Sequence, residues 1–156
     1  MSITDYDSLK AAVADFLNRD DMTAMIANFV QFAEAGFNRS IRHWRMETVT
    51  TFTGNAQFED LPTDWIETVR VDVSGGPRLK LVSRAEMQAL REHSEDTAGE
   101  PTHYALIGGQ IELYPTPDGD YTLNHVYVAE IAALSDGNTT NWLLTAAPDL
   151  YVYAAL

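Results

Sequence analysis

The chain has 156 residues, of which 46% are hydrophobic and 21% charged, a composition typical of a folded protein with a moderate core. Its formal net charge of −13 disfavours strong binding to nucleic acid or to anionic membranes, because such binding depends on Lys and Arg. No cysteine is present, which excludes disulfides, thiolate metal sites and a cysteine nucleophile.

The charge is unevenly distributed along the chain. Residues 1–45 carry 6 acids and 5 bases, residues 46–100 carry 11 acids and 5 bases, and residues 101–156 carry 6 acids and no base. Two interpretations remain open. The acidity serves solubility alone, or it allows DNA to pass close to the protein without adhering.

The first third of the chain predicts two helices. Residues 4–7 are typical of a helix N-cap, and residues 18–21 end the first helix and cap the second, which we expect from about Met22 to about Trp44. The apolar residues that share one face of the first helix are Leu9, Val13, Phe16 and Leu17. The cations that suit the negative end of the second helix are Arg39, Arg42, His43 and Arg45.

The middle of the chain changes to a period of two residues. Residues 48–53 are β-branched, and residues 68–73 alternate between apolar and polar side chains, so both predict strands. A turn at residues 74–77 suggests residues 79–81 as a partner strand. Ser83 and Glu86 then form a capping box, which predicts a short helix to about Arg91.

A hairpin is the clearest β signal. Residues 103–107 and 110–114 flank Gly108-Gly109, a two-residue link that suits the turns that hairpins prefer. A polar segment over residues 93–100 predicts a flexible loop before this hairpin, and residues 121–128 predict a further strand after it.

The predicted fold is therefore α+β, in one domain over residues 1–156. It combines an N-terminal helical pair, a central antiparallel β-rich region with a short helix, and a C-terminal helix that begins at Pro148. That last helix has only about nine residues, or about 13 Å, and no Lys or Arg at its end. We expect either that it packs against the second helix or that the sequence is a C-terminally truncated form of a longer protein.

The sequence gives little indication of enzymatic chemistry. The four histidines have no metal-ligand spacing and are interpreted as structural; they are His43, His93, His103 and His125. Asp118-Gly119-Asp120 lacks the other ligands of a calcium loop and is interpreted as a turn. Glu59, Asp60 and Asp64 leave open a carboxylate acid–base pair, although solvated loop charges are the favoured interpretation. We predict no enzyme activity, no cofactor and no metal.

One basic cluster stands out. Arg39, Arg42 and Arg45 lie close together in the sequence with Trp44 among them, and these four residues are the candidate interface. Their cations have three possible partners: carboxylates or the helix dipole of the same chain, the acidic surface of a partner protein, or a nucleic-acid backbone. Three arginines are too few to predict DNA binding.

Three stretches carry a family resemblance. They are AEAGFNRSIRHWRMETVTTFT at residues 33–53, LPTDWIETVRV at residues 61–71, and the segment from PTHYALIGGQIELYPTPDGDY to TNWLLTAAPDLYVYAAL within residues 101–156. Their order and spacing resemble those of predicted phage adaptor proteins, the head–tail connectors of tailed bacteriophages and prophages.

The resemblance implies a structural role without catalytic residues. Such proteins assemble as a ring, often of twelve subunits, beneath the portal protein. The ring extends the DNA channel, through which DNA passes without specific binding, and it docks the tail or stopper protein. The resemblance also implies a virion protein at the head–tail junction, made in the bacterial cytoplasm and independent of membranes. A basic patch on one copy would then meet acids on the next in a head-to-tail contact.

Two other functions stay open. The first is another phage neck or tail completion protein with a similar fold. The second is a carboxylate-dependent glycan hydrolase, which would require paired carboxylates about 5–9 Å apart in a cleft.

Overall fold

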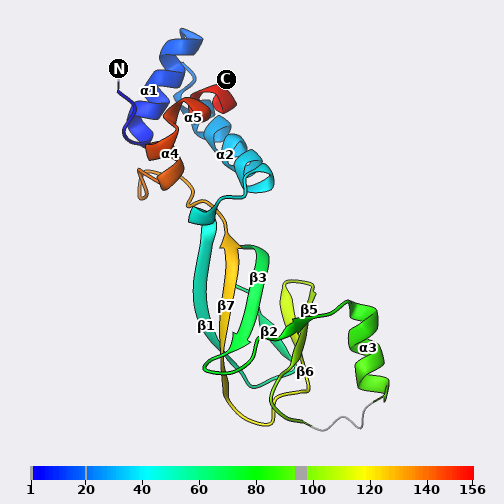
Figure 1. The fold of residues 1–156 in the computed structure, drawn as a ribbon. Coiled ribbons are helices and arrows are strands. Elements are labelled where there is room, and N and C mark those ends of the chain that lie inside the picture. Colours follow the sequence, from blue (N-terminus) through cyan, green and yellow to red (C-terminus); the bar gives the residue numbers. More distant parts are fainter. Residues whose placement is uncertain (1, 20, 94–97) are drawn as a thin grey trace. The chain divides into compact units, whose positions relative to one another are not determined.

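A computed structural model describes residues 2–19, 21–93 and 98–156 and confirms the α+β fold (Figure 1). The chain forms two compact units. The helical unit comprises Met1–Met46 and Glu130–Leu156, and the β unit comprises Glu47–Ala129. Each unit is described by itself, and one domain over residues 1–156 stays a prediction.

The helical unit contains four α-helices and one 3₁₀ helix among the described residues. They are α1 (Tyr6–Leu17), α2 (Thr23–Ser40), η1 (Trp44–Met46), α4 (Trp142–Ala146) and α5 (Pro148–Ala155). The predicted C-terminal helix is confirmed, and it packs back on both α1 and α2 (Figure 1). α4 was not predicted as a helix, and two of its residues, Leu143 and Leu144, are buried.

The first helix begins where the sequence predicts. The Asp5 carboxylate accepts a hydrogen bond from the Ser8 N–H at 2.8 Å, and the Ser8 hydroxyl oxygen accepts one from the Asp5 N–H at 3.0 Å, so the two residues form a reciprocal cap. The helix ends at Asn18, whose φ of 50° is left-handed. Of the apolar residues predicted to share one face, Leu9 and Val13 are fully buried, whereas Phe16 is 68% exposed.

The second helix is shorter than predicted. It begins after Met22, whose side chain makes no capping bond, and it ends at Ser40 instead of near Trp44. Asp20, which belonged to the predicted cap, lies outside the described residues. At the other end Ile41 takes an extended conformation, so the residues after it leave the helix axis. Arg42, Trp44 and Arg45 therefore do not share one helical face with Arg39.

A buried polar network joins the parts of the helical unit. Glu34 on α2 is only 5% exposed, and its Oε1 accepts hydrogen bonds from the Leu134 N–H at 2.8 Å and the Tyr151 hydroxyl at 3.2 Å. The Tyr151 hydroxyl accepts in turn from Asn141 Nδ2 at 2.6 Å, while Asn141 Oδ1 caps α4 through the Leu144 N–H. Burial raises the pKa of the Glu34 carboxyl, opposed by the hydrogen bonds from Leu134 and Tyr151.

The described residues of the β unit form two sheets and one helix. Strands β1 (Glu47–Gly54), β7 (Tyr121–Ala129) and β3 (Trp65–Val73) form an antiparallel sheet in that order. The second sheet has the order β2 (Phe58–Asp60), β6 (Gln110–Tyr114), β5 (His103–Ile107) and β4 (Lys80–Leu81). The predicted hairpin is confirmed as β5 and β6, and the positive φ of Gly108 and Gly109, 57° and 86°, suits its turn.

Residues 79–81 pair differently from the prediction. We expected them to pair with the strand before them, but β4 pairs parallel with β5. Contact with β3 is limited to the two residues just before β4. Arg78 forms an isolated bridge with Asp72, and the Leu79 N–H donates to the Val71 carbonyl at 2.9 Å. The chain thus leaves one sheet and joins the other within a few residues.

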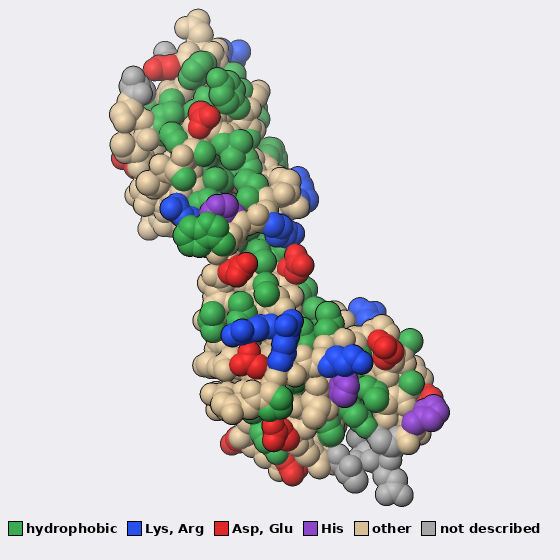
Figure 2. Space-filling view, viewed as in Figure 1, with side chains coloured by type: hydrophobic (Ala, Val, Ile, Leu, Met, Phe, Trp, Pro, Cys, Tyr) green, Lys and Arg blue, Asp and Glu red, His purple; other side chains and the backbone are tan. Residues whose placement is uncertain are grey.

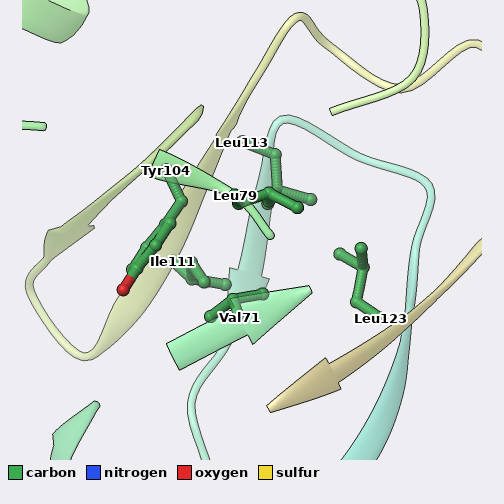
Figure 3. Close-up of a cluster of buried hydrophobic side chains, with 6 residues drawn as sticks. All are labelled: Val71, Leu79, Tyr104, Ile111, Leu113 and Leu123. Carbon is green, nitrogen blue, oxygen red and sulfur yellow. The ribbon is translucent and has the colours of Figure 1, made fainter. Parts of the chain in front are cut away.

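A hydrophobic core lies between the strands of the β unit. Its six buried side chains converge from four strands and from the segment before β4 (Figure 3); they are Val71, Leu79, Tyr104, Ile111, Leu113 and Leu123. Gly54, the last residue of β1, packs directly against Leu113 and Leu123 of this core. A Cβ there would lie 2.7 Å from Leu123 Cδ1, so only glycine fits without displacement.

The short helix α3 (Arg84–His93) covers a second cluster of buried residues, which includes Met87 and Tyr114. Its predicted capping box is confirmed: the Ser83 N–H donates to Glu86 at 2.9 Å, and the Glu86 N–H donates to Ser83 Oγ at 3.2 Å. Of the predicted loop at residues 93–100, residues 94–97 lie outside the described residues. Within the part of the chain that is described, no helix is long and apolar enough to span a membrane.

The Glu34 network yields a first prediction. Glu34→Ala should lower the free energy of unfolding by about 2–4 kcal/mol, because it leaves the Leu134 N–H and the Tyr151 hydroxyl buried without their acceptor. Glu34→Gln keeps an acceptor oxygen and should lower it less. Urea titration followed by circular dichroism measures both variants.

The pH dependence provides a control with a defined sign. A carboxyl whose pKa is raised by folding stabilises the protein below the unfolded pKa, and this contribution is lost as the pH rises through the folded pKa. As the pH rises from the unfolded pKa through the folded pKa of Glu34, the wild type should therefore lose stability relative to Glu34→Gln. A constant difference between the two proteins would contradict the buried, pKa-shifted carboxyl.

Candidate protein-interaction site

The end of α2 determines where the candidate interface residues lie. Ser40 Oγ donates to the Gly36 carbonyl at 2.7 Å, and the Ile41 N–H closes the last turn on the Phe37 carbonyl at 2.8 Å. Arg42 folds back on this helix end, where its Nη1 donates to the Asn38 carbonyl at 2.9 Å and the Ile41 carbonyl at 2.7 Å. Of the three interpretations of the cluster, Arg42 thus fits the intramolecular one, because it satisfies carbonyls that the helix leaves open.

Trp44 and Arg45 belong to a different arrangement, a stack of rings. The His43 ring stacks on the Trp142 indole, with the centroids 5.2 Å apart and the planes at 22°, and it also contacts the Trp44 indole, with the centroids 5.4 Å apart and the planes at 34°. The Arg45 guanidinium carbon lies 5.4 Å from the Trp44 ring centroid and 5.9 Å from the Trp142 ring centroid. We call these four residues, His43, Trp44, Arg45 and Trp142, the Trp–Arg cluster.

The Trp–Arg cluster is held by both its own backbone and the core. The Arg45 N–H donates to His43 Nδ1 at 3.2 Å, which fixes the imidazole relative to η1. Trp142 begins α4 directly after Asn141, the residue that caps α4 and contacts Tyr151. The buried network around Glu34 therefore positions Trp142 for its contact with His43 and Arg45.

The cluster is exposed and its cation is available. The Trp44 side chain is 69% exposed, and Arg39 and Arg45 are also exposed. Within the described ranges, neither Arg39 nor Arg45 forms an ion pair with a carboxylate. Figure 2 shows Lys or Arg side chains in blue beside a purple His and a large green side chain in the helical unit. Exposed Trp and Arg side chains that are already ordered are typical of binding hot spots.

Sequence reasoning identified half of this cluster. It named Trp44 and Arg45, but it treated His43 as a helix-end residue and did not include Trp142 in the candidate interface. Because almost 100 positions separate His43 from Trp142, no local spacing signals their contact. Arg39, in the last turn of α2, and Arg42 lie outside the ring stack.

Apolar hollows flank α5 in the same unit. One, of about 340 Å³, is lined by Leu17, Met22, Phe29, Phe32, Ala154, Ala155 and Leu156. The other, of about 250 Å³, is lined by Ile3, Phe16, Pro148, Asp149, Val152 and Tyr153. Phe32 lines the first hollow and Phe16 the second, and they are 70% and 68% exposed.

The acidic residues proposed for acid–base chemistry have structural partners. Glu59 accepts from the Asn55 and Ala56 N–H groups, both at 2.9 Å. Asp60 accepts from Gln110 Nε2 at 2.8 Å, and Asp64 accepts from the Tyr127 hydroxyl at 3.0 Å. These contacts favour a structural role for the three carboxylates. No group of three or more potential metal ligands was found among the residues that the structure describes.

His125 is also structural in this geometry. It is 1% exposed, and its Nε2 lies 2.9 Å from Thr68 Oγ1, which accepts from Trp65 Nε1 at 2.9 Å. Because a hydroxyl has one donor and two acceptor sites, Thr68 either donates to an unprotonated Nε2 or accepts from Nε2–H, according to the His125 tautomer. Burial lowers the pKa of the His125 imidazole and favours its neutral form.

The Trp–Arg cluster exposes aromatic and arginine side chains, whereas the buried polar groups of the same unit stabilise the fold. This combination is typical of a structural protein that works through contacts with other proteins. The chain belongs to the SU10 adaptor protein family, whose sequence model matches residues 4–156. It is thus a phage adaptor, a structural kind of virion protein that interacts with other head and tail proteins. No curated protein sequence matches the chain.

The second prediction concerns the Trp–Arg cluster. Trp142→Ala should remove the ring that orders His43 and Arg45, so the intrinsic fluorescence and near-ultraviolet circular dichroism of Trp44 should shift towards those of a free, solvated indole. The free energy of unfolding should fall by about 1–2 kcal/mol, since the Trp142 side chain is only partly buried. Trp65→Phe, in the β unit, serves as the matched control. An unchanged Trp44 signal in Trp142→Ala would contradict the stack.

Proposed function

We propose that this chain is the head–tail adaptor that joins a tailed phage's portal to its tail. Copies form a ring beneath the portal protein, the ring extends the DNA channel, and its lower surface docks the tail or stopper protein. The observation that carries the proposal is the adaptor family match over residues 4–156. A ring of twelve subunits, the number that the family resemblance implies, is part of the proposal.

The Trp–Arg cluster supplies a contact between neighbouring copies in this proposal. Its Arg45, together with Arg39, requires carboxylates, and the β unit carries 14 acidic and 5 basic residues. A basic site that meets a separate acidic surface on the next copy is a head-to-tail contact, and repetition of such a contact closes a ring. The indole of Trp44 adds apolar area beside the charge, which strengthens the contact beyond a solvated ion pair.

The excess of acids has a role in the channel. Carboxylates that face the ring lumen repel the DNA backbone, so packaged DNA slides instead of adhering. The localisation that follows is the head–tail junction of the virion.

The third prediction tests assembly on the portal. Wild-type chain should co-sediment with the purified cognate portal ring, several copies to each ring, and Arg39→Glu/Arg45→Glu should reduce the number bound because like charges then face each other across the subunit contact. Arg19→Glu is the matched control, because Arg19 is exposed in the same unit but already pairs with Asp21 at 2.8 Å.

The two parts of the proposal fail in different ways. If the wild type does not bind the portal, the adaptor function is wrong. If the wild type binds and the double variant binds equally well, the function stands and the role of the Trp–Arg cluster is wrong.

The fourth prediction concerns DNA passage. Replacement of exposed acids of the β unit, as in Glu47→Gln with Asp60→Asn, should slow DNA ejection and increase DNA retention in assembled particles, because less negative charge faces the DNA. Asp21→Asn in the helical unit should have a smaller effect. Equal ejection and retention in all particles would leave solubility as the explanation of the acidity.

A further inference from the structure

The outer edge of β1 is a long, regular strand edge. β1 is one of the two edge strands of its sheet, and over all eight of its residues it pairs with β7 alone. Among the described residues, no backbone hydrogen bond from outside this sheet reaches Glu47–Gly54. An edge of this length is a template for another strand.

The hydrogen bonds of the sheet show which β1 groups point outwards. The Ser74 N–H donates to the Thr122 carbonyl at 2.8 Å, so the backbone groups of Thr122 face β3. Because successive residues of a strand bond to opposite neighbours, Leu123 and His125 face β1 instead. Their register partners are Phe52 and Thr50.

It follows that β1 uses its even-numbered residues to bond β7. The odd-numbered residues direct their N–H and C=O groups away from the sheet; they are Glu47, Val49, Thr51 and Thr53. All four side chains are exposed, and Val49 is 68% exposed.

The opposite edge of the same sheet is protected. β3 has two register shifts, between Trp65 and Glu67 and between Thr68 and Arg70, which interrupt a regular edge. Its outward carbonyls are also used: Arg78 Nη2 donates to Val69 O at 3.2 Å, and Leu79 N donates to Val71 O at 2.9 Å. By contrast, β1 has no register shift, no proline and no lysine, and its one charge is Glu47 at its end.

We propose that the β1 edge pairs with the β1 edge of a second copy of this chain in the free protein. The occupant must be an extended segment of matching length, and the other sheet edges are too short, with three residues in β2 and two in β4. The β3 edge cannot supply this segment, because its register shifts and its bonded carbonyls interrupt regular pairing. β1 itself is the one strand edge in the described part of the chain that offers a full-length match.

Charge placement decides the direction of the pairing. In a parallel pair the two Glu47 carboxylates would lie side by side and repel each other. An antiparallel pair centred on Thr50 places Glu47 opposite Thr53 of the second copy, so the two carboxylates lie at opposite ends. It also places Val49 opposite Thr51, which brings β-branched side chains together on one face.

This contact has a different symmetry from the ring contact. An antiparallel β1 pair is two-fold, so it satisfies both edges and stops at two copies, whereas a head-to-tail contact repeats. The pair thus covers an aggregation-prone edge in the protein before assembly, and it does not depend on the proposed ring.

Sedimentation velocity of the full chain over a range of concentrations tests the pairing. The wild type should approach twice the chain mass of 17.4 kDa as concentration rises. Thr51→Pro, which removes an outward N–H but no bond to β7, should remain at the single mass, and Val49→Lys should do so as well by placing charge on the edge. A wild type that stays monomeric throughout, or a variant that dimerises like the wild type, overturns the proposal.

Val69→Lys is the matched control for Val49→Lys, since it places a charge on the exposed side of the β3 edge strand. It should dimerise like the wild type, and dissociation of its dimer would mean that β3 takes part and that the β1–β1 pairing is wrong.

Hydrogen exchange gives a readout independent of variant folding. With rising concentration, the amides of Val49, Thr51 and Thr53 should become protected, while those of Thr50 and Phe52 should stay protected throughout; a uniform change would overturn the proposal.

Discussion

The buried carboxylate of Glu34 is the constraint on which the helical unit depends. An acid almost removed from water is tolerated only where donors surround it, and here the donors are the Leu134 N–H and the Tyr151 hydroxyl. Both donors come from chain segments that follow the β unit. The buried carboxyl group on α2 therefore requires the C-terminal part of the chain to return to the N-terminal helices, where α5 packs on α1 and α2.

The same network connects stability to the interaction surface. Asn141 lies between Tyr151 and the first turn of α4, and the next residue is Trp142. The indole of Trp142 then holds the His43 ring and lies close to the Arg45 guanidinium. Arg45 is thus ordered before any partner arrives, so a partner's carboxylate does not bear the full entropic cost of ordering a long side chain.

The interaction surfaces proposed for the two units differ in kind. The helical unit offers side chains, an arginine and an exposed indole, whose contacts depend on charge and are weakened by salt. The β unit offers backbone groups along β1, whose pairing depends on strand length and register and is much less sensitive to salt. The repeated contact proposed for the first surface and the closed contact proposed for the second are therefore separable by ionic strength as well as by symmetry.

Elements with a local cause could be predicted from the amino-acid sequence. Caps and turns act within a few residues, so the residue types and their spacing are enough to predict them. The examples here are the Asp5–Ser8 cap, the Ser83–Glu86 capping box and the Gly108-Gly109 turn. The position of β7 between β1 and β3, the pairing of β4 with β5 and the contact of His43 with Trp142 could not be predicted in this way. These contacts join distant segments, and the free energy that selects them comes from burial of the whole core, which no local spacing encodes.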